Sequence, residues 1–219
     1  MARMARLVIP NYPHHVTQRG SRKQTTFFST QDYLLYVDLL ASAKEKARVD
    51  IWAYCLMPNH VHLVVTPETK EGICALLQNA HRIYARRINA REGWRGHLWQ
   101  ERFHSFVMDE KYLLATVRYT ELNPVRAGLC EQPDDWRWSS VHAHMKGVDD
   151  QLVSVAPMLH RVQDWPKFLG SRDSDDGYDK IREHAKSGRP VGGSQFIQQL
   201  ERLAGRKLGM RKRGPKIRN

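Results

Sequence analysis

Residues 54–65 read Tyr-Cys-Leu-Met-Pro-Asn-His-Val-His-Leu-Val-Val, and the rest of the chain is organised around this stretch. Its valine-rich half favours a β-strand, in which successive side chains point to opposite faces. His60 and His62 therefore lie on one face with their Cβ atoms about 6–7 Å apart, while Val61 turns into a core. Two imidazoles at this separation predict a divalent-metal site, with two ordinary exposed histidines as the alternative.

The chain has 219 residues and a formal net charge of +12, from 35 Lys and Arg against 23 Asp and Glu. This charge favours nucleic acid over a membrane as partner, because no apolar run approaches the roughly 20 residues of a spanning helix. Cys55, Cys74 and Cys130 form no Cys-x-x-Cys pair, and the first residues lack the apolar run of a secretory signal. We therefore expect free thiols and a cytoplasmic protein that associates with the nucleoid through DNA.

Hydrophobic periodicity predicts the order strand, helix, strand, strand, helix, strand. The strands are expected at residues 7–9 with 15–19, 51–56, 60–65 and 98–107, and the helices at 30–48 and 71–88. In the first strand, His15, Thr17 and Arg19 share one face. This order predicts an α+β, ferredoxin-like fold, an antiparallel sheet with two helices on one face, followed by a C-terminal helical extension.

A further helix is predicted after Asp109, which can cap it. The helix carries Tyr112 and Tyr119, which are seven residues apart and so lie roughly on one face. It is expected to end at about Leu122, because the residue before Pro124 avoids the α region.

Residues 57–62, Met-Pro-Asn-His-Val-His, resemble the metal-binding motif of the HUH single-strand nucleases, two histidines around a hydrophobic residue. In this form they are similar in particular to the REP-associated tyrosine transposases, relatives of the single-tyrosine insertion-sequence transposases. Residues 118–128, Arg-Tyr-Thr-Glu-Leu-Asn-Pro-Val-Arg-Ala-Gly, resemble the nucleophile helix of that family. Two motifs in the right order are more specific than either alone. The resemblance covers about residues 6–144 and implies the HUH nuclease fold.

The resemblance implies a metal-dependent endonuclease and strand transferase that cleaves single-stranded hairpin DNA, such as REP-like palindromes, through a 5′-phosphotyrosine. Tyr119 stands at the nucleophile position of the motif Tyr-x-x-x-Asn-Pro, and Tyr112 is the rival nucleophile. His60 and His62 would bind the metal together with Asn123, which replaces the glutamine that related transposases carry four residues after the tyrosine.

The resemblance also implies Mg²⁺ or Mn²⁺, whereas imidazole pairs by themselves suit zinc or copper. No nucleotide cofactor is expected, and the protein is expected to be a monomer, with a dimer as the alternative. His104, on a neighbouring predicted strand, is a further candidate ligand. The N-terminal segment of the family reads the sequence beside the hairpin, and the second predicted helix has a basic side. The candidate DNA contacts are therefore Arg19, Arg22, Lys23, Arg82 and Arg86.

We divide the chain into an HUH single-tyrosine transposase domain at residues 1–145, a connecting segment at 146–179 that ends in an acidic linker at 173–179, and a short helix with a basic tail at 180–219. Two other classes stay open. The ferredoxin-like sheet resembles RNA-binding domains, so a non-catalytic RNA- or DNA-binding module is one alternative, although the aromatic-rich strands of such domains are absent. A zinc enzyme is the other, although no third ligand follows at a standard spacing.

Overall fold

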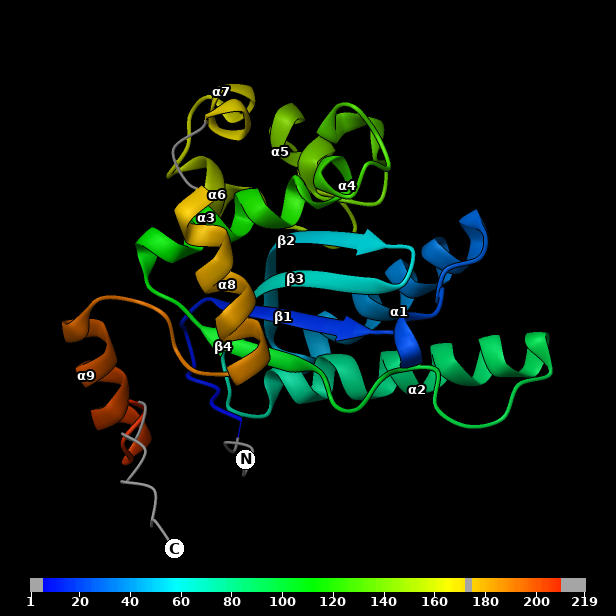
Figure 1. Ribbon diagram of the computed structural model, residues 1–219, viewed down its shortest axis with the longest axis horizontal. Helices are drawn as coiled ribbons and strands as arrows, with labels where there is room; N and C mark the ends of the chain where they lie inside the picture. The colour runs from blue at the N-terminus through cyan, green and yellow to red at the C-terminus, as the bar shows by residue number, and fades with distance from the viewer. Residues whose placement is uncertain (1–5, 172–174, 210–219) are drawn as a thin grey trace, which may run out of the picture.

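The structure, a computed structural model, describes residues 6–171 and 175–209 and confirms the ferredoxin-like α+β fold. Its strands form one antiparallel sheet in the order β2-β3-β1-β4 (Figure 1). They are β1 (His14–Arg19), β2 (Val49–Met57), β3 (His60–Pro67) and β4 (His104–Val107). α1 (Thr30–Ala47) connects β1 to β2, and α2 (Gly72–Glu92) connects β3 to β4.

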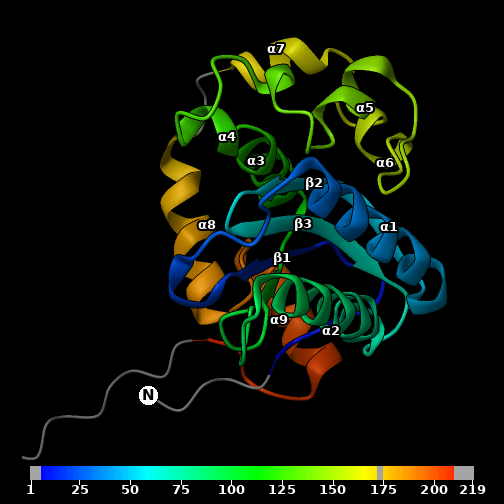
Figure 2. The same cartoon turned by 90° about the vertical axis from the view of Figure 1, so that its right-hand side faces the viewer.

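α1 and α2 cover one face of the sheet, as predicted (Figure 2). Val61, Leu63 and Val65 of β3 point into this layer and have no exposed surface. Burying each of these side chains stabilises the fold by about 1.5–3 kcal/mol. Because strand side chains alternate between the two faces, His60 and His62 point to the opposite face.

The opposite face is covered in part by α3 (Glu110–Glu121) and α8 (Asp175–Ser187), and Figure 2 shows α8 on the other side of the sheet from α1 and α2. Val64, Phe106 and Ile181 are fully buried in this second layer. The sequence did not place either helix on this face. The histidine pair therefore lies between the sheet and two helices, and not on an open sheet face.

The strand predicted at residues 98–107 is shorter in the structure, where β4 begins at His104. Glu101 has a φ of 55°, which turns the chain out of the extended conformation. Just before this turn, Gln100 donates its backbone N–H to the carbonyl of Arg19 at 2.7 Å. The segment before Glu101 therefore follows the end of β1 and does not extend β4.

Leu7 and Ile9 do not belong to a strand, contrary to the expectation for residues 7–9. Both are buried against Leu200 of α9 (Ser194–Ala204), the amphipathic helix that the sequence predicts. Apolar contact with a distant helix thus takes the place of strand pairing in this segment.

α3 ends at Glu121, next to the predicted end at Leu122. A short helix, α4 (Asn123–Arg126), follows at once with Pro124 in its first turn, where a missing N–H costs nothing. Asn123 is therefore helical, although we expect a residue before proline to avoid the α region.

The acidic segment at residues 173–179 is not a linker from Asp175 onwards, because α8 begins there and runs across the predicted boundary after residue 179. Tyr178 and Ile181 are buried against the second layer, which holds this helix in place despite its acidic start. The remaining short elements are η1 (Ser21–Lys23), η2 (Pro133–Asp135), α5 (Val141–Lys146), α6 (Ala156–Leu159) and α7 (Trp165–Gly170). Residues 210–219 of the predicted basic tail and 172–174 of the predicted connecting segment lie outside the described residues.

Cys55, Cys74 and Cys130 are free thiols, as predicted. Burial in β2 raises the pKa of the Cys55 thiol well above its usual value, which keeps this thiol protonated and unreactive. Among the helices of residues 6–171 and 175–209, none is both long and apolar enough to cross a membrane.

Candidate active site

His60 and His62 share one face of β3, as the alternation predicts. Their ring centroids are 4.9 Å apart, and the ring planes are inclined by 73°. On the neighbouring strand β1, Arg19 pairs with His60 and Thr17 pairs with His62. His62 is 5% exposed, whereas His60 is partly exposed. The pair therefore presents one buried and one accessible imidazole to the space above the sheet.

His15 of β1 orients the ring of His62. The two rings are stacked, with centroids 5.2 Å apart, and His15 Nε2 lies 3.0 Å from His62 Nδ1. The amide nitrogen of Asn123 lies 3.0 Å from His62 Nε2. Because an amide nitrogen only donates, His62 Nε2 is the acceptor, and His62 Nδ1 donates its proton to His15; these tautomers are assigned from the hydrogen-bond partners. His60 is held in the same manner, with Nδ1 donating to Asn59 Oδ1 at 2.6 Å.

Burial lowers the pKa values of His60, His62 and His15. The pKa of His60 falls to about 4, first through burial and then through the positive charge of Arg19. Burial also holds the pKa of His62 well below its ordinary value, and the neighbouring His60, His15 and Arg19 lower it further. The pKa of His15 falls to about 3 through burial alone. All three rings are therefore neutral at pH 7, and neutral imidazole is the form that binds metal ions.

α3 brings Tyr119 to the histidines. The ring centroid of Tyr119 lies 5.6 Å from that of His62 and 6.3 Å from that of His15. α3 begins where predicted, because the Asp109 side chain accepts the backbone N–H of Tyr112 at 3.0 Å. Tyr112 packs against the second core layer and does not line the cavity that holds Tyr119. Two helical turns, about 10 Å along the axis, thus separate the two candidate nucleophiles.

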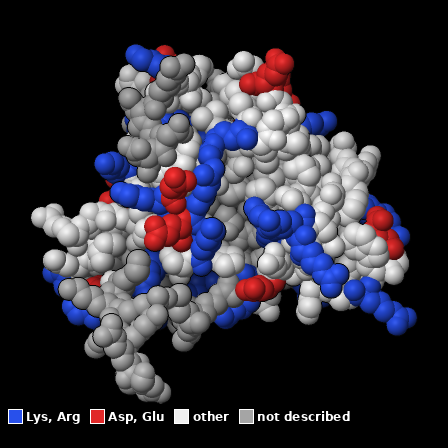
Figure 3. Space-filling view, viewed as in Figure 1, with Lys and Arg blue, Asp and Glu red and all other residues white. Residues whose placement is uncertain are grey.

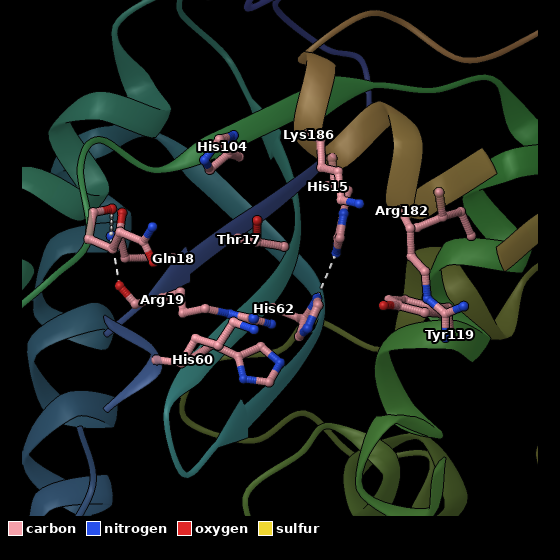
Figure 4. A pocket seen from close by; sticks show the side chains of 14 residues that line it. His15, Thr17, Gln18, Arg19, His60, His62, His104, Tyr119, Arg182 and Lys186 are labelled. Carbon is pink, nitrogen blue, oxygen red and sulfur yellow. Dashed lines mark hydrogen bonds between the residues drawn. The ribbon is translucent and has the colours of Figure 1, made fainter. Parts of the chain in front are cut away.

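A cavity of about 350 Å³ lies between the sheet, α3 and α8. Figure 4 shows side chains from these elements converging on it, with Tyr119 and Arg182 on one side and His60 and His62 below. Its lining residues are His15, Thr17, Gln18, Arg19, Lys23, His60, His62, Gln100, His104, Tyr119, Ile181, Arg182, Ala185 and Lys186. The two sequence motifs therefore meet in one cavity, although Asn123 reaches it only through its contact with His62.

The predicted DNA contacts do not form one cluster. Arg19 and Lys23 line the cavity, while Arg22 lines a separate hollow beside it. Arg82 lines a third hollow next to α2, and Arg86 is exposed on the same helix. The basic side chains thus extend outwards from the site along the surface.

His15, Arg182 and Lys186 line the cavity but were not among the predicted site residues. The alternation in β1 put His15 on the same face as Arg19. Only the antiparallel register with β3, in which His15 pairs with Val64 and Thr17 with His62, makes His15 a diagonal neighbour of His62. No local signal connects α8 with this site, because its position depends on contacts between distant segments.

The donor set fits a divalent ion that takes few ligands from the protein. Within residues 6–171 and 175–209, no group of three or more His, Cys, Asp or Glu side chains could hold a metal. His60 and His62 nevertheless each donate an Nδ1 proton to a partner, which is how metal-binding histidines are oriented. An ion held by the two imidazoles and the amide oxygen of Asn123 would replace the hydrogen bond from Asn123 to His62 Nε2 and would take its other ligands from phosphate oxygens and water.

A His-x-His pair on a ferredoxin-like sheet faces a tyrosine on the following helix, which is the arrangement expected from the resemblance to the single-tyrosine transposases of the HUH type. The model of the family described as "Transposase IS200 like" matches residues 9–123, more than half of the chain. The chain belongs to this family of IS200-like transposases.

Two known proteins are similar to this chain. A Haemophilus influenzae protein named as a candidate REP-associated tyrosine transposase is 28% identical over 105 residues, 43% of this chain and 60% of that protein. The matched part thus spans less than two thirds of that relative. The solved structure of a REP-associated tyrosine transposase bound to a REP hairpin is 21% identical, with a TM-score of 0.58, and the match covers 71% of this chain and 94% of that one. At this identity the likeness establishes a shared fold.

Proposed function

We propose that this protein is a metal-dependent endonuclease and strand transferase that acts on single-stranded DNA at hairpins, with Tyr119 as its nucleophile. The observation that carries the proposal is the position of Tyr119, whose ring centroid lies 5.6 Å from that of His62 in a cavity shared with His60. Phenol is a weak nucleophile because its reference pKa is about 10. Attack on a phosphodiester at neutral pH therefore needs positive charge nearby, which this cavity can provide.

His60, His62 and Asn123 would hold the ion, Mg²⁺ or Mn²⁺. Bound there, it would polarise the scissile phosphate and stabilise negative charge on the leaving 3′ oxygen. The Tyr119 oxygen forms a bond to phosphorus while the bond from phosphorus to the 3′ oxygen breaks, which gives a 5′-phosphotyrosine and a free 3′-hydroxyl. The phosphodiester energy stays in the covalent bond, so rejoining needs no nucleotide cofactor.

The basic surface supports a DNA backbone as the partner. Figure 3 shows Lys and Arg side chains on both sides of the central hollow of this face. Arg19 and Lys23 line the cavity itself, and Arg22 and Arg82 line neighbouring hollows. Such a surface can hold the duplex of a hairpin while unpaired nucleotides enter the site. The proposed substrate is a REP-like palindrome, and a monomer carries all the site residues named here.

Covalent capture tests the proposal. A hairpin DNA labelled at its 3′ end is incubated with the protein and Mn²⁺, Mg²⁺ or EDTA, and the products are separated on denaturing gels. A 5′-phosphotyrosine joins the protein to the DNA fragment on the 3′ side of the cut, so the 3′ label marks the covalent adduct. The variants are Tyr119→Phe and, as a matched control on the same helix, Tyr112→Phe.

We expect a metal-dependent adduct with the wild-type protein and with Tyr112→Phe, and none with Tyr119→Phe. Loss of the adduct only in Tyr112→Phe would assign the nucleophile to the other tyrosine. Cleavage without an adduct would indicate a nuclease that activates water. Hairpin binding without adduct or cleavage, with several hairpins and both metals, would instead identify a binding module.

A further inference from the structure

α8 presents one of its faces to the proposed active site. Five side chains that are three or four residues apart lie on this face: Tyr178, Ile181, Arg182, Ala185 and Lys186. All but Tyr178 line the cavity, and the Tyr178 ring packs on Tyr119 with centroids 5.3 Å apart. The segment that matches the family ends at residue 123, so the match assigns no role to this helix.

The ring of Tyr119 is fixed by its neighbours. The Arg126 guanidinium lies 5.1 Å from the ring centroid of Tyr119 and 4.4 Å from that of Tyr178. On another side, the ring meets His62 nearly edge-on, at an interplanar angle of 77°. These contacts fix the aromatic ring of Tyr119, while its hydroxyl group points into the cavity (Figure 4).

Arg182 is the cation that α8 places beside Tyr119 (Figure 4). Hydrogen bonding to Tyr119 is the main cause that raises the pKa of Arg182, so this guanidinium keeps its charge at every working pH. Arg182 also donates to Asp179 on the same helix at 3.0 Å. Because the side chains of Arg182 and Asp179 are 49% and 87% exposed, this ion pair is weak and leaves the guanidinium able to bind an anion.

We propose that Arg182 is a further catalytic residue, whose guanidinium binds the non-bridging oxygens of the scissile phosphate next to the Tyr119 hydroxyl. This rests on the proposed function of Tyr119 as nucleophile. Across the cavity, Arg19 accompanies the histidine pair, so positive charge borders the phosphate position from two elements.

The chemical step balances without a proton from Arg182. The Tyr119 oxygen bonds to phosphorus and releases its proton to solvent water, while the leaving 3′ oxygen keeps the bonding electron pair and takes a proton from water. Arg182 supplies a fixed charge and paired N–H donors where negative charge gathers on the phosphate oxygens. The same contacts then hold the phosphotyrosine until the strand is rejoined.

The test compares adduct formation by the wild-type protein, Arg182→Gln, Arg182→Lys and Lys180→Gln with 3′-labelled hairpin DNA and Mn²⁺. Lys180 is exposed on α8 and does not line the cavity, so Lys180→Gln removes an equal charge from the same helix. Single-turnover rate constants are measured at saturating protein, and the dissociation constant for the hairpin by fluorescence anisotropy. Far-ultraviolet circular dichroism and thermal unfolding check the fold of each variant.

We expect Arg182→Gln to lower the single-turnover rate constant by about 10- to 100-fold, because it removes donors to charge that develops in the transition state. Its dissociation constant for the hairpin should rise by no more than about threefold, since one phosphate contact among many contributes little to affinity. Arg182→Lys keeps the charge but loses the paired donors, so its rate constant should lie between those of the wild-type protein and Arg182→Gln. Lys180→Gln should react at the wild-type rate.

A wild-type rate constant for Arg182→Gln, or a deficit that disappears at saturating protein, would overturn the role of Arg182 while leaving Tyr119 as the nucleophile. If Arg182→Gln does not fold, Arg182→Lys decides: a reduced rate constant supports the role, and a wild-type one overturns it. Failure of the wild-type protein to form any adduct contradicts the proposed function itself, and the role of Arg182 with it.

Discussion

His15 Nε2 and His62 Nδ1 lie 3.0 Å apart in two stacked rings on neighbouring strands. This hydrogen bond commits the Nδ1 proton of His62 and leaves its Nε2 lone pair directed at Asn123. A partner at the second ring nitrogen fixes the orientation of metal-binding histidines. The readiness of His62 to bind an ion therefore depends on His15.

His15→Phe keeps a ring at this position but removes the nitrogen that accepts from His62. We expect its affinity for Mn²⁺ to drop by about 10- to 100-fold, as is usual when the partner of a ligating histidine is lost. Titration calorimetry of the DNA-free protein measures this. His160→Gln, at an exposed histidine, is the control and should bind Mn²⁺ like the wild type. Equal affinities for His15→Phe and wild type would rule out this role.

Asn123 can be tested as a ligand with two substitutions, one that strengthens its oxygen donor and one that removes it. Asn123→Asp offers a carboxylate, which Mg²⁺ and Mn²⁺ prefer to an amide, so its affinity for Mn²⁺ should increase. Asn123→Ala offers no oxygen, so its affinity should decrease. The same calorimetry compares the two variants. If Asn123→Ala binds Mn²⁺ as the wild type does, Asn123 is not a ligand.

Glu121 anchors the end of α3 between Tyr119 and Asn123. Its fully buried carboxylate accepts hydrogen bonds from three donors: Ser140 Oγ at 2.5 Å, His144 Nδ1 at 2.7 Å and Trp165 Nε1 at 2.8 Å. Glu121→Ala leaves His144 Nδ1 and Trp165 Nε1 buried without this acceptor, whereas Ser140 Oγ keeps the carbonyl of Tyr54 at 3.3 Å. We expect the free energy of unfolding to fall by about 3–5 kcal/mol, the usual cost of breaking a buried pair from one side, as measured by urea titration.

Glu110→Ala provides the matched control for Glu121→Ala. Glu110 is on the same helix, but its carboxylate is exposed and pairs with Arg161 at the surface. Removing this pair should change the free energy of unfolding by no more than about 1 kcal/mol. Similar losses in the two variants would show that the buried network adds nothing to stability.

His14 gives the free energy of unfolding a pH dependence. Its Nδ1 donates to the carbonyl of Tyr12 at 2.7 Å, and its Nε2 accepts the N–H of Ile9 at 3.1 Å. Burial lowers its pKa from 6.5 to about 4. Above pH 6.5 neither state is protonated, and between pH 6.5 and about 4 only the unfolded chain binds the proton. Stability therefore falls as the pH is lowered through this range, and this contribution is constant below it.

His14→Gln should remove this contribution. We expect the slope of the unfolding free energy against pH, between pH 6 and 5, to be shallower than in the wild type by up to about 1.4 kcal/mol per pH unit. Urea unfolding at several pH values gives both slopes. The other buried histidines are present in both proteins, so their contributions cancel, and identical slopes would contradict the neutral state of His14.

Arg22 and Arg82 line hollows beside the active site, where a DNA backbone would pass. Arg22→Ala and Arg82→Ala should each weaken hairpin binding and reduce the slope of log affinity against log salt by about 1. Anisotropy titrations at four salt concentrations measure this. Arg161→Ala, at a residue paired with Glu110, should leave the slope unchanged. An unchanged slope in Arg22→Ala would place the DNA path elsewhere.

The sequence by itself determined the features that depend on neighbouring residues. Strand alternation placed His60 and His62 on one face, and Asp109 correctly marked the start of the helix that carries Tyr119. The order of strands and helices was also readable, because each has its own hydrophobic period. The strand predicted at residues 98–107 was wrong in its first half, because the left-handed backbone of Glu101 interrupts a sequence that alternates like a strand.

Only the tertiary structure decided which of these features meet. The register of β1 on β3 places His15 diagonally next to His62. The axial rise along α3 brings Tyr119, and not Tyr112, to the cavity. Arg182 reaches the site because the apolar side of α8 is buried against the second core layer. Such contacts join residues far apart in the chain, and their stability comes from apolar area removed from water, which no local sequence pattern assigns to a particular partner.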